Sequence, residues 1–267
     1  MFFKWCFVTY FRHSCVHNLV LFLTPRPLKI KLLEKMAGHI NLLLKQAVTT
    51  FSMPAKTNFP KNIEKLKCLL DKTKGSDLGL HSEHDIFKQE SWCHPGKAPV
   101  TYVQIYDDDA VSVGVFIVAE NMKLPLHDHP HMHGLIKVIY GTLKISSYTI
   151  SECLDDKQVD VECHTPINLH YIDPPCILEP NHQNLHEIES VDGVAAFVDI
   201  LAPPYDVLIP ELGKRKCTYF KRIRQTGVNK MLLESIESPS WFWCDQLPYS
   251  GPHIEEDFVL HEKTSEN

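Results

Sequence analysis

Four histidines alternate with other residues in one short stretch of this chain: His127, His129, His131 and His133. Successive side chains of a β-strand point to opposite faces. His127 and His129 would therefore project from one face, where they can share a metal ion. Pro130 lacks a backbone N–H and interrupts strand pairing, so His131 and His133 need not continue that face. The spacing predicts two metal ligands on one strand.

A metal ion held by two imidazoles needs a third ligand from elsewhere in the chain. The best candidate is His186, which follows a turn-rich segment and is expected to open a strand. A single histidine on a strand is more often structural, and an isolated His-x-His pair is a weak metal signal. The distant third histidine strengthens the metal interpretation, because imidazole is the commonest metal ligand in proteins.

The composition limits the class of protein that can carry this site. The chain has 267 residues, is 44% hydrophobic and 22% charged, and has a formal net charge of −6. It is long enough to bury one good-sized core, and its acidic balance argues against a nucleic-acid partner. Nine cysteines with irregular spacing and no Cys-x-x-Cys pair favour a reducing compartment over a disulfide framework or a structural zinc site.

Residues 1–35 form a basic, apolar N-terminal extension that differs from the rest of the chain. They carry six basic side chains and one acidic side chain, Glu34. Their apolar runs are shorter than the roughly 20 residues that a spanning helix needs, so no stable membrane insertion is expected. The extension is interpreted as a presequence or as an alternative start ahead of Met36. The expected location is the cytoplasm, or the mitochondrion if the presequence is real.

Hydrophobic periodicity places helices before strands. Apolar residues recur at helical spacing from Ile40 to Phe51, and a second helix is expected at about 60–73, before an irregular connection over 74–99. These helices are expected to pack against the edge of the main domain. A period of two then predicts strands at 100–106, 112–119, 134–140, 142–149, 169–172, 185–189, 194–201 and 217–223. A hairpin is expected at Tyr140-Gly141-Thr142 and an exposed loop at 151–166. Many short strands are typical of an antiparallel sandwich or barrel.

Further segments match one known family in their residues and order. They are Pro99–Tyr102, Pro125–Pro130, Met132–Gly134, Tyr140–Thr142, Asn184–His186, Asp199–Asp206, Phe242–Cys244 and Pro248–Pro252. Together they resemble the plant cysteine oxidase and cysteamine dioxygenase family of the cupin superfamily, from about Met36 to Pro252. The resemblance implies a mainly β fold, the cupin double-stranded β-helix (a jelly-roll-like barrel), with N-terminal helices. It divides the chain into the extension at 1–35, a helical segment and linker at 36–95, a thiol dioxygenase domain at 96–258 and a tail at 259–267.

The sequence departs from the general cupin pattern at one informative place. That pattern has a Glu shortly after the His-x-His pair, whereas here His133 and Gly134 stand in this window. Loss of the carboxylate points to a three-histidine site, as in the thiol dioxygenases of the superfamily. The resemblance then implies Fe(II) bound by His127, His129 and His186, with O2 as co-substrate. His131 is not expected to be a ligand.

Four more residues are candidates through the same resemblance. Cys217 and Tyr219 match the Cys-x-Tyr pair at which the animal enzyme can form a thioether cross-link, although a buried cysteine near a core tyrosine is the simpler interpretation. Asp199 and Tyr205 are candidates on the substrate side. Asp199 lies in an apolar strand and needs a partner. A substrate ammonium, a group behind an iron ligand or the Ala202–Pro204 turn could each supply one.

The implied reaction adds both atoms of O2 to a thiol and gives a sulfinate. The implied substrates are small aminothiols such as cysteamine, which gives hypotaurine, and proteins with an N-terminal cysteine, which give Cys-sulfinic acid. An oxygen-sensing role in the hypoxia response follows from the resemblance only. A monomer is expected. The alternatives are a zinc or manganese cupin isomerase, another metal-dependent oxygenase, a non-catalytic cupin binding module, or an interaction module made by the N-terminal helices.

Overall fold

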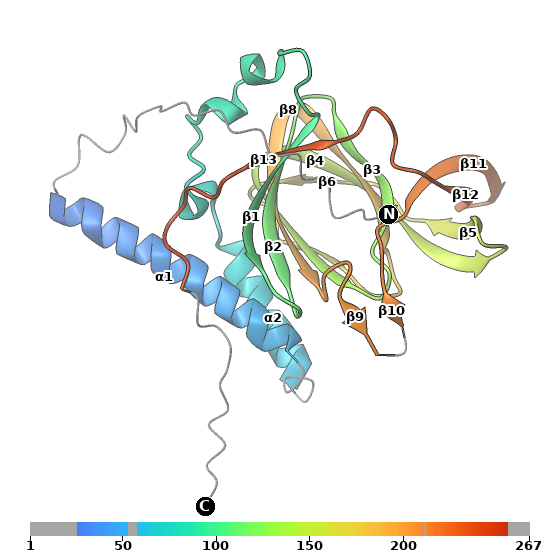
Figure 1. Ribbon diagram of the computed structural model, residues 1–267, viewed down its shortest axis with the longest axis horizontal. Coiled ribbons are helices and arrows are strands. Elements are labelled where there is room, and N and C mark those ends of the chain that lie inside the picture. Colours follow the sequence, from blue (N-terminus) through green and yellow to red (C-terminus); the bar gives the residue numbers. More distant parts are fainter. Residues whose placement is uncertain (1–25, 53–57, 211, 256–267) are drawn as a thin grey trace, which may run out of the picture.

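The computed structural model describes residues 26–52, 58–210 and 212–255 of the chain (Figure 1). Two helices come first, α1 (Arg26–Phe51) and α2 (Phe59–Asp71), followed by the short 3-10 helices η3 (Gly75–Leu78), η4 (Asp85–Phe87) and η5 (Gln89–Trp92). The strands are β1 (Val100–Asp107), β2 (Ser112–Val118), β3 (Lys123–Asp128), β4 (His133–Cys153), β5 (Gln158–Cys163), β6 (Ile167–His170), β7 (Cys176–Leu178), β8 (Leu185–Ala202), β9 (Leu208–Ile209), β10 (Gly213–Lys214), β11 (Tyr219–Gly227), β12 (Lys230–Ile236) and β13 (Cys244–Leu247).

Six of the strands close into a barrel. The pairing runs β8–β3–β11–β12–β5–β4, and β4 then pairs back with β8. Further strands extend this sheet on both sides, with β2, β1 and β13 beyond β8, and β6 and β7 against β4. Most pairs are antiparallel, whereas β13 runs parallel to β1. The architecture confirms the expectation of a mainly β, jelly-roll-like barrel with helices near the N-terminus.

Two long, bent strands account for most of the barrel. β4 pairs with β8 twice, at residues 133–138 and again at 142–148. Between the two stretches Gly141 has a φ of +69°, and an added Cβ would lie 2.4 Å from the carbonyl oxygen of Val194. Only glycine fits so close to a neighbouring strand at this backbone angle. The hairpin predicted at Tyr140-Gly141-Thr142 is therefore wrong, because the segment is a bulge inside one continuous strand.

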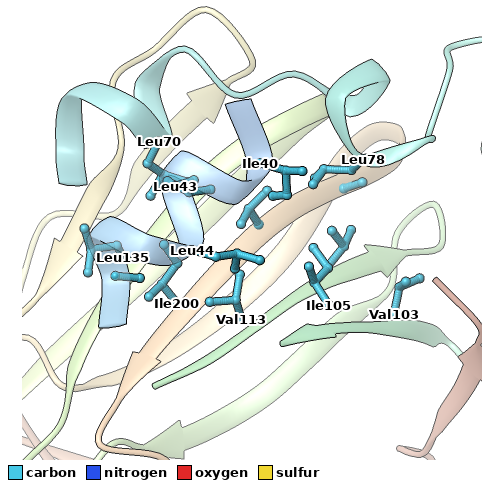
Figure 2. Packing of buried hydrophobic residues seen from close by; sticks show 14 of the residues in the cluster. Ile40, Leu43, Leu44, Leu70, Leu78, Val103, Ile105, Val113, Leu135 and Ile200 are labelled. Carbon is cyan, nitrogen blue, oxygen red and sulfur yellow. The ribbon is translucent and has the colours of Figure 1, made fainter. Parts of the chain in front are cut away.

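The helices cover the outer face of the sheet. Ile40, Leu43 and Leu44 of α1 are fully buried and belong to one cluster, called the outer cluster below, with Leu66 and Leu70 of α2. In Figure 2 this cluster continues into the strands, where Val103, Ile105, Val113, Leu135 and Ile200 face the helices. The expected packing of the helices against the main domain is confirmed. α1 begins at Arg26, ten residues earlier than the sequence pattern starting at Met36 indicates.

Several other boundaries differ from those predicted. The expected loop at 151–166 contains the end of β4 and all of β5, because polar residues alternate with the buried Val159 and Val161. The strands expected at 185–189 and 194–201 are one strand, β8. The expected helix at 60–73 and the irregular connection at 74–99 are present, the latter with its three 3-10 turns. Expectations for residues 1–25 and for the tail at 259–267 lie outside the described residues.

Two further features concern the helices and the cysteines. Neither α1 nor α2 has a stretch apolar enough to cross a membrane, nor has any other helix of the described residues. The seven cysteines of the described residues are all free thiols.

Candidate metal centre

The structure brings three histidines together inside the barrel. His127 lies on β3, His129 follows directly after that strand, and His186 is the second residue of β8. Antiparallel pairing of β3 with β8 sets His127 directly opposite His186. The three side chains are buried, and one ligand atom from each lies within 4.8 Å of the others. Among the described residues no other group of histidine, cysteine or carboxylate side chains meets this condition.

Hydrogen bonds at the Nδ1 atoms fix which nitrogen of two rings is free. His127 Nδ1 lies 2.8 Å from the carbonyl oxygen of Pro125, which can only accept, so Nδ1 carries the proton. Tyr205 Oη donates to the carbonyl oxygen of Asp128 at 2.5 Å and lies 2.9 Å from His129 Nδ1. Because the hydroxyl has already used its proton, His129 Nδ1 donates to it. Both rings therefore keep an unprotonated Nε2 for a metal ion.

The convergence of the Nε2 atoms fits a divalent metal ion. His129 Nε2 and His186 Nε2 are 3.0 Å apart. Two nitrogens bound at about 2.1 Å from one ion, at a right angle, would have about this separation. Burial lowers the pKa of His127 to about 4, and burial with neighbouring imidazoles holds the pKa values of His129 and His186 well below the usual range. Neutral imidazole is the form that binds a metal ion.

Backbone contacts hold the ligand-bearing segments at their ends. His129 N donates to Asn184 O at 2.8 Å, which ties the end of β3 to the approach to β8. Asp128 Oδ1 accepts from Thr218 N at 2.7 Å, and Asp128 N donates to Thr218 O. The Asp128 carboxylate thus binds the chain before β11 and is not among the clustered metal ligands. Burial raises its pKa to about 6. Sequence reasoning gave Asp128 no role.

The other two histidines of the motif point away from the cluster. His131 is exposed and adopts a φ of +57° in the turn after β3. His133 opens β4 and packs against the rings of Phe51 and Phe59, with ring centroids 5.7 and 5.1 Å away. The turn at Pro130 therefore ends the shared face.

Cys217 and Tyr219 lie beside the histidines. Tyr219 is the first residue of β11 and pairs with His127 across the β3–β11 contact. Cys217 precedes the strand, and its thiol is within hydrogen-bonding reach of both Tyr205 and Tyr219. Burial raises the pKa of Cys217 to about 12, so the thiol is protonated at neutral pH. Phe242 packs edge-on against Tyr219 with ring centroids 5.9 Å apart.

Asp199 is a buried carboxyl in the second half of β8. Its neighbours across the sheet are Gly114 and Ile136. Phe197, on the same face of β8, belongs with Phe116 and Ile136 to a second buried cluster, called the inner cluster below. No hydrogen bond or ion pair to its carboxylate occurs among the described residues, so the Ala202–Pro204 turn does not supply its partner. Burial raises the pKa of Asp199 to about 7.

The chain is similar to several known proteins. Residues 69–254 match the family PCO_ADO. Human 2-aminoethanethiol dioxygenase is 32% identical over 83% of this chain and 98% of its own length. Plant cysteine oxidase 2 of Arabidopsis thaliana is 26% identical over 73% of this chain and 75% of its own. A solved double-stranded β-helix protein from Klebsiella pneumoniae is 17% identical, covers 45% of this chain and 91% of its own, and has a TM-score of 0.30.

Proposed function

The chain belongs to the PCO_ADO family, and from this premise we propose that it is a non-haem Fe(II) thiol dioxygenase. The overall reaction is RSH + O2 → RSO2H, so both oxygen atoms end on the sulfur of a sulfinic acid. The observation that carries the proposal is the convergence of three neutral, buried imidazoles with no carboxylate among them. When bound, Fe(II) would supply the chemistry of dioxygen and a position for the substrate sulfur.

The ligand set suits a thiolate substrate. Three neutral imidazoles leave the whole charge of a divalent ion uncompensated, which favours an anionic sulfur ligand. A carboxylate ligand would cancel part of that charge. The protein then contributes binding and orientation, because reactants held in register gain a large effective concentration.

Asp199, which interacts electrostatically with Tyr205, suits a substrate that also carries an amine. The Asp199 carboxyl has no partner among the described residues, and a substrate ammonium would provide one when the carboxyl is ionised. Cysteamine and a protein with an N-terminal cysteine share a free amine two carbons from the thiol. We therefore expect the protein to bind both substrates through their thiol and their amine. The names of the relatives, 2-aminoethanethiol dioxygenase and plant cysteine oxidase, refer to an aminothiol and to cysteine.

Mass spectrometry of the products tests the proposal. Fe(II)-loaded protein is incubated in air with cysteamine and, separately, with a peptide that begins with cysteine. We expect a gain of two oxygen atoms on sulfur, both labelled when the gas is ¹⁸O2. The matched control peptide has an acetylated N-terminus and should react poorly, because it lacks the cation.

The His127→Ala variant is the protein control and should lose both metal and turnover. No oxygen gain on either substrate, with iron shown to be bound, would contradict the proposal. That result would favour another metal-dependent cupin enzyme or a non-catalytic binding module. We further propose a cytoplasmic location, or a mitochondrial one if residues 1–35 are a presequence, which imaging of the full-length chain would test.

A further inference from the structure

Arg215 is a buried cation, although in the sequence it is the middle residue of three consecutive basic residues. It stands between Lys214 and Lys216, both exposed, whereas its own exposed fraction is 5%. No carboxylate forms an ion pair with it among the described residues. Its guanidinium group instead donates to backbone carbonyl oxygens. A buried charge is costly without such partners, so the site is built around this side chain.

The guanidinium group joins the two loops that carry the His129–Tyr205 hydrogen bond. Nη1 donates to Pro130 O at 3.2 Å, next to His129. Nη2 donates to Pro203 O at 3.2 Å and to Pro204 O at 2.8 Å, directly before Tyr205. One planar group therefore spans the loop after β3 and the loop after β8.

The backbone of Arg215 adds a second tie on the other side of the tyrosine. Asp206 N donates to Arg215 O at 2.8 Å. Tyr205 is thus flanked by residues that the same arginine holds, through its side chain on one side and through its carbonyl on the other. Tyr205 in turn contacts His129 Nδ1 at 2.9 Å.

Resting on the proposed function, we infer that Arg215 is a positioning residue for the metal centre, which sets the orientation of the His129 ring through Tyr205. Its fork shape matters as much as its charge. Lysine carries the same charge on one nitrogen atom and cannot reach carbonyl groups on two loops in the same way. Groups that orient a ligating histidine typically change metal affinity 10- to 100-fold when they are removed.

Co(II) titration of the metal-free full-length protein tests the inference, since bound Co(II) reports both affinity and ligand geometry through its visible spectrum. We expect Arg215→Lys to weaken Co(II) binding by about tenfold and to alter the spectrum. Arg224→Lys, at an exposed position on β11, should leave both unchanged. Leu44→Ala removes a fully buried side chain from the outer cluster, so it should lower the melting temperature but not the affinity. An Arg215→Lys protein with wild-type affinity and spectrum would overturn the inference.

A double-mutant cycle separates positioning from general destabilisation. Tyr205→Phe alone should weaken Co(II) binding. In the Arg215→Lys protein the same change should have little further effect, because the tyrosine is already displaced. Independent, multiplying effects of the two changes would contradict the inference. Should Arg215→Lys fail to fold, Arg215→Gln takes its place, since it removes the buried charge and keeps an amide donor that is too short to join both loops. Thiol turnover by the wild type is measured separately, so a failure of the proposed function leaves the Co(II) result readable.

Discussion

At the scale of single residues, the titration of Asp199 gives a pH test of substrate binding. Its pKa of about 7 in the folded protein means that the carboxylate forms mainly between pH 6 and pH 8. Since the ionised form attracts a cationic aminothiol, the KM for cysteamine should fall by about tenfold over this range in the wild type. In Asp199→Asn the KM should depend less on pH. If KM changed with pH in the same way in both proteins, Asp199 would have no role in binding the substrate. Ionisation of the substrate thiol is common to both proteins and cancels in the comparison.

Ionisation of Asp199 should favour substrate binding but destabilise the folded protein. The carboxyl ionises near pH 3.8 in the unfolded chain and near 7 in the folded protein. The folded state therefore holds a proton that the unfolded state has lost, and the wild type should lose stability as the pH rises from about 4 to 7. Asp199→Asn lacks this loss, which is of the order of a few kcal/mol. Thermal unfolding of both proteins at pH 5 and pH 8 measures it.

A third residue-scale prediction concerns Cys217 and Tyr219. Their contact places a thiol beside a phenol, so a thioether bond needs only local movement. Forming it removes one hydrogen from the thiol and one from the ring, and dioxygen, the co-substrate of the proposed reaction, would accept both and leave as hydrogen peroxide. Tyr219→Phe should lower the turnover rate without abolishing it, and should prevent the accompanying change in gel mobility. Two results together would show that no functional cross-link forms: a wild-type turnover rate in Tyr219→Phe, and no change in the gel mobility of the wild type under aerobic conditions.

At the scale of elements, the bulge in β4 should be sensitive to a single methyl group. Gly141→Ala places a Cβ 2.4 Å from Val194 O, at a φ of +69°. Gly213 has a nearly equal φ of +72° but open space around it, so Gly213→Ala is a matched control for the backbone angle alone. We expect Gly213→Ala to cost about 1 kcal/mol of unfolding free energy and Gly141→Ala clearly more, at about 2–4 kcal/mol. Denaturant unfolding measures both losses of free energy. If they were equal, β8 would have moved at Val194 to make room for the added methyl group.

These elements also show what the sequence could reveal. Alternating apolar residues predicted most of β1, β2, β4, β8 and β11, whereas β3 and β12 were not predicted from this pattern. The His-x-His spacing with His186 identified the group that the structure brings together. Continuity was harder to predict, because a glycine that ends a strand and one that bulges within it look alike in sequence. β5 was missed because its polar residues hide the buried Val159 and Val161. Arg215 was missed because three adjacent cations are usually all solvated, and only tertiary contacts show that one of them is buried.

At the scale of the whole molecule, one packed region stabilises the fold and another binds the metal ion. The outer cluster joins α1 and α2 to one face of the sheet, whereas the three histidines lie within the barrel. Residues alternate between the two along β8, where Val198 and Ile200 belong to the outer cluster and Phe197 to the inner one. The same strands contribute side chains to two separate environments. Substitutions in the outer cluster should therefore lower the stability and leave the metal affinity unchanged.

Metal removal tests this division. An ion that binds only the folded state stabilises it by RT ln(1 + [M]/Kd), about 2.7 kcal/mol at a concentration 100 times Kd. Co(II) should therefore raise the melting temperature of the wild type, and chelation should reverse the rise. Leu44→Ala should unfold at a lower temperature, costing about 2–5 kcal/mol, yet gain the same increment from Co(II). Leu42→Ala, at a position 57% exposed on the same helix, should change neither value. His186→Ala should start near the wild-type melting temperature and gain nothing from Co(II). A reduced increment in Leu44→Ala would mean that the helices and the metal centre form one coupled unit.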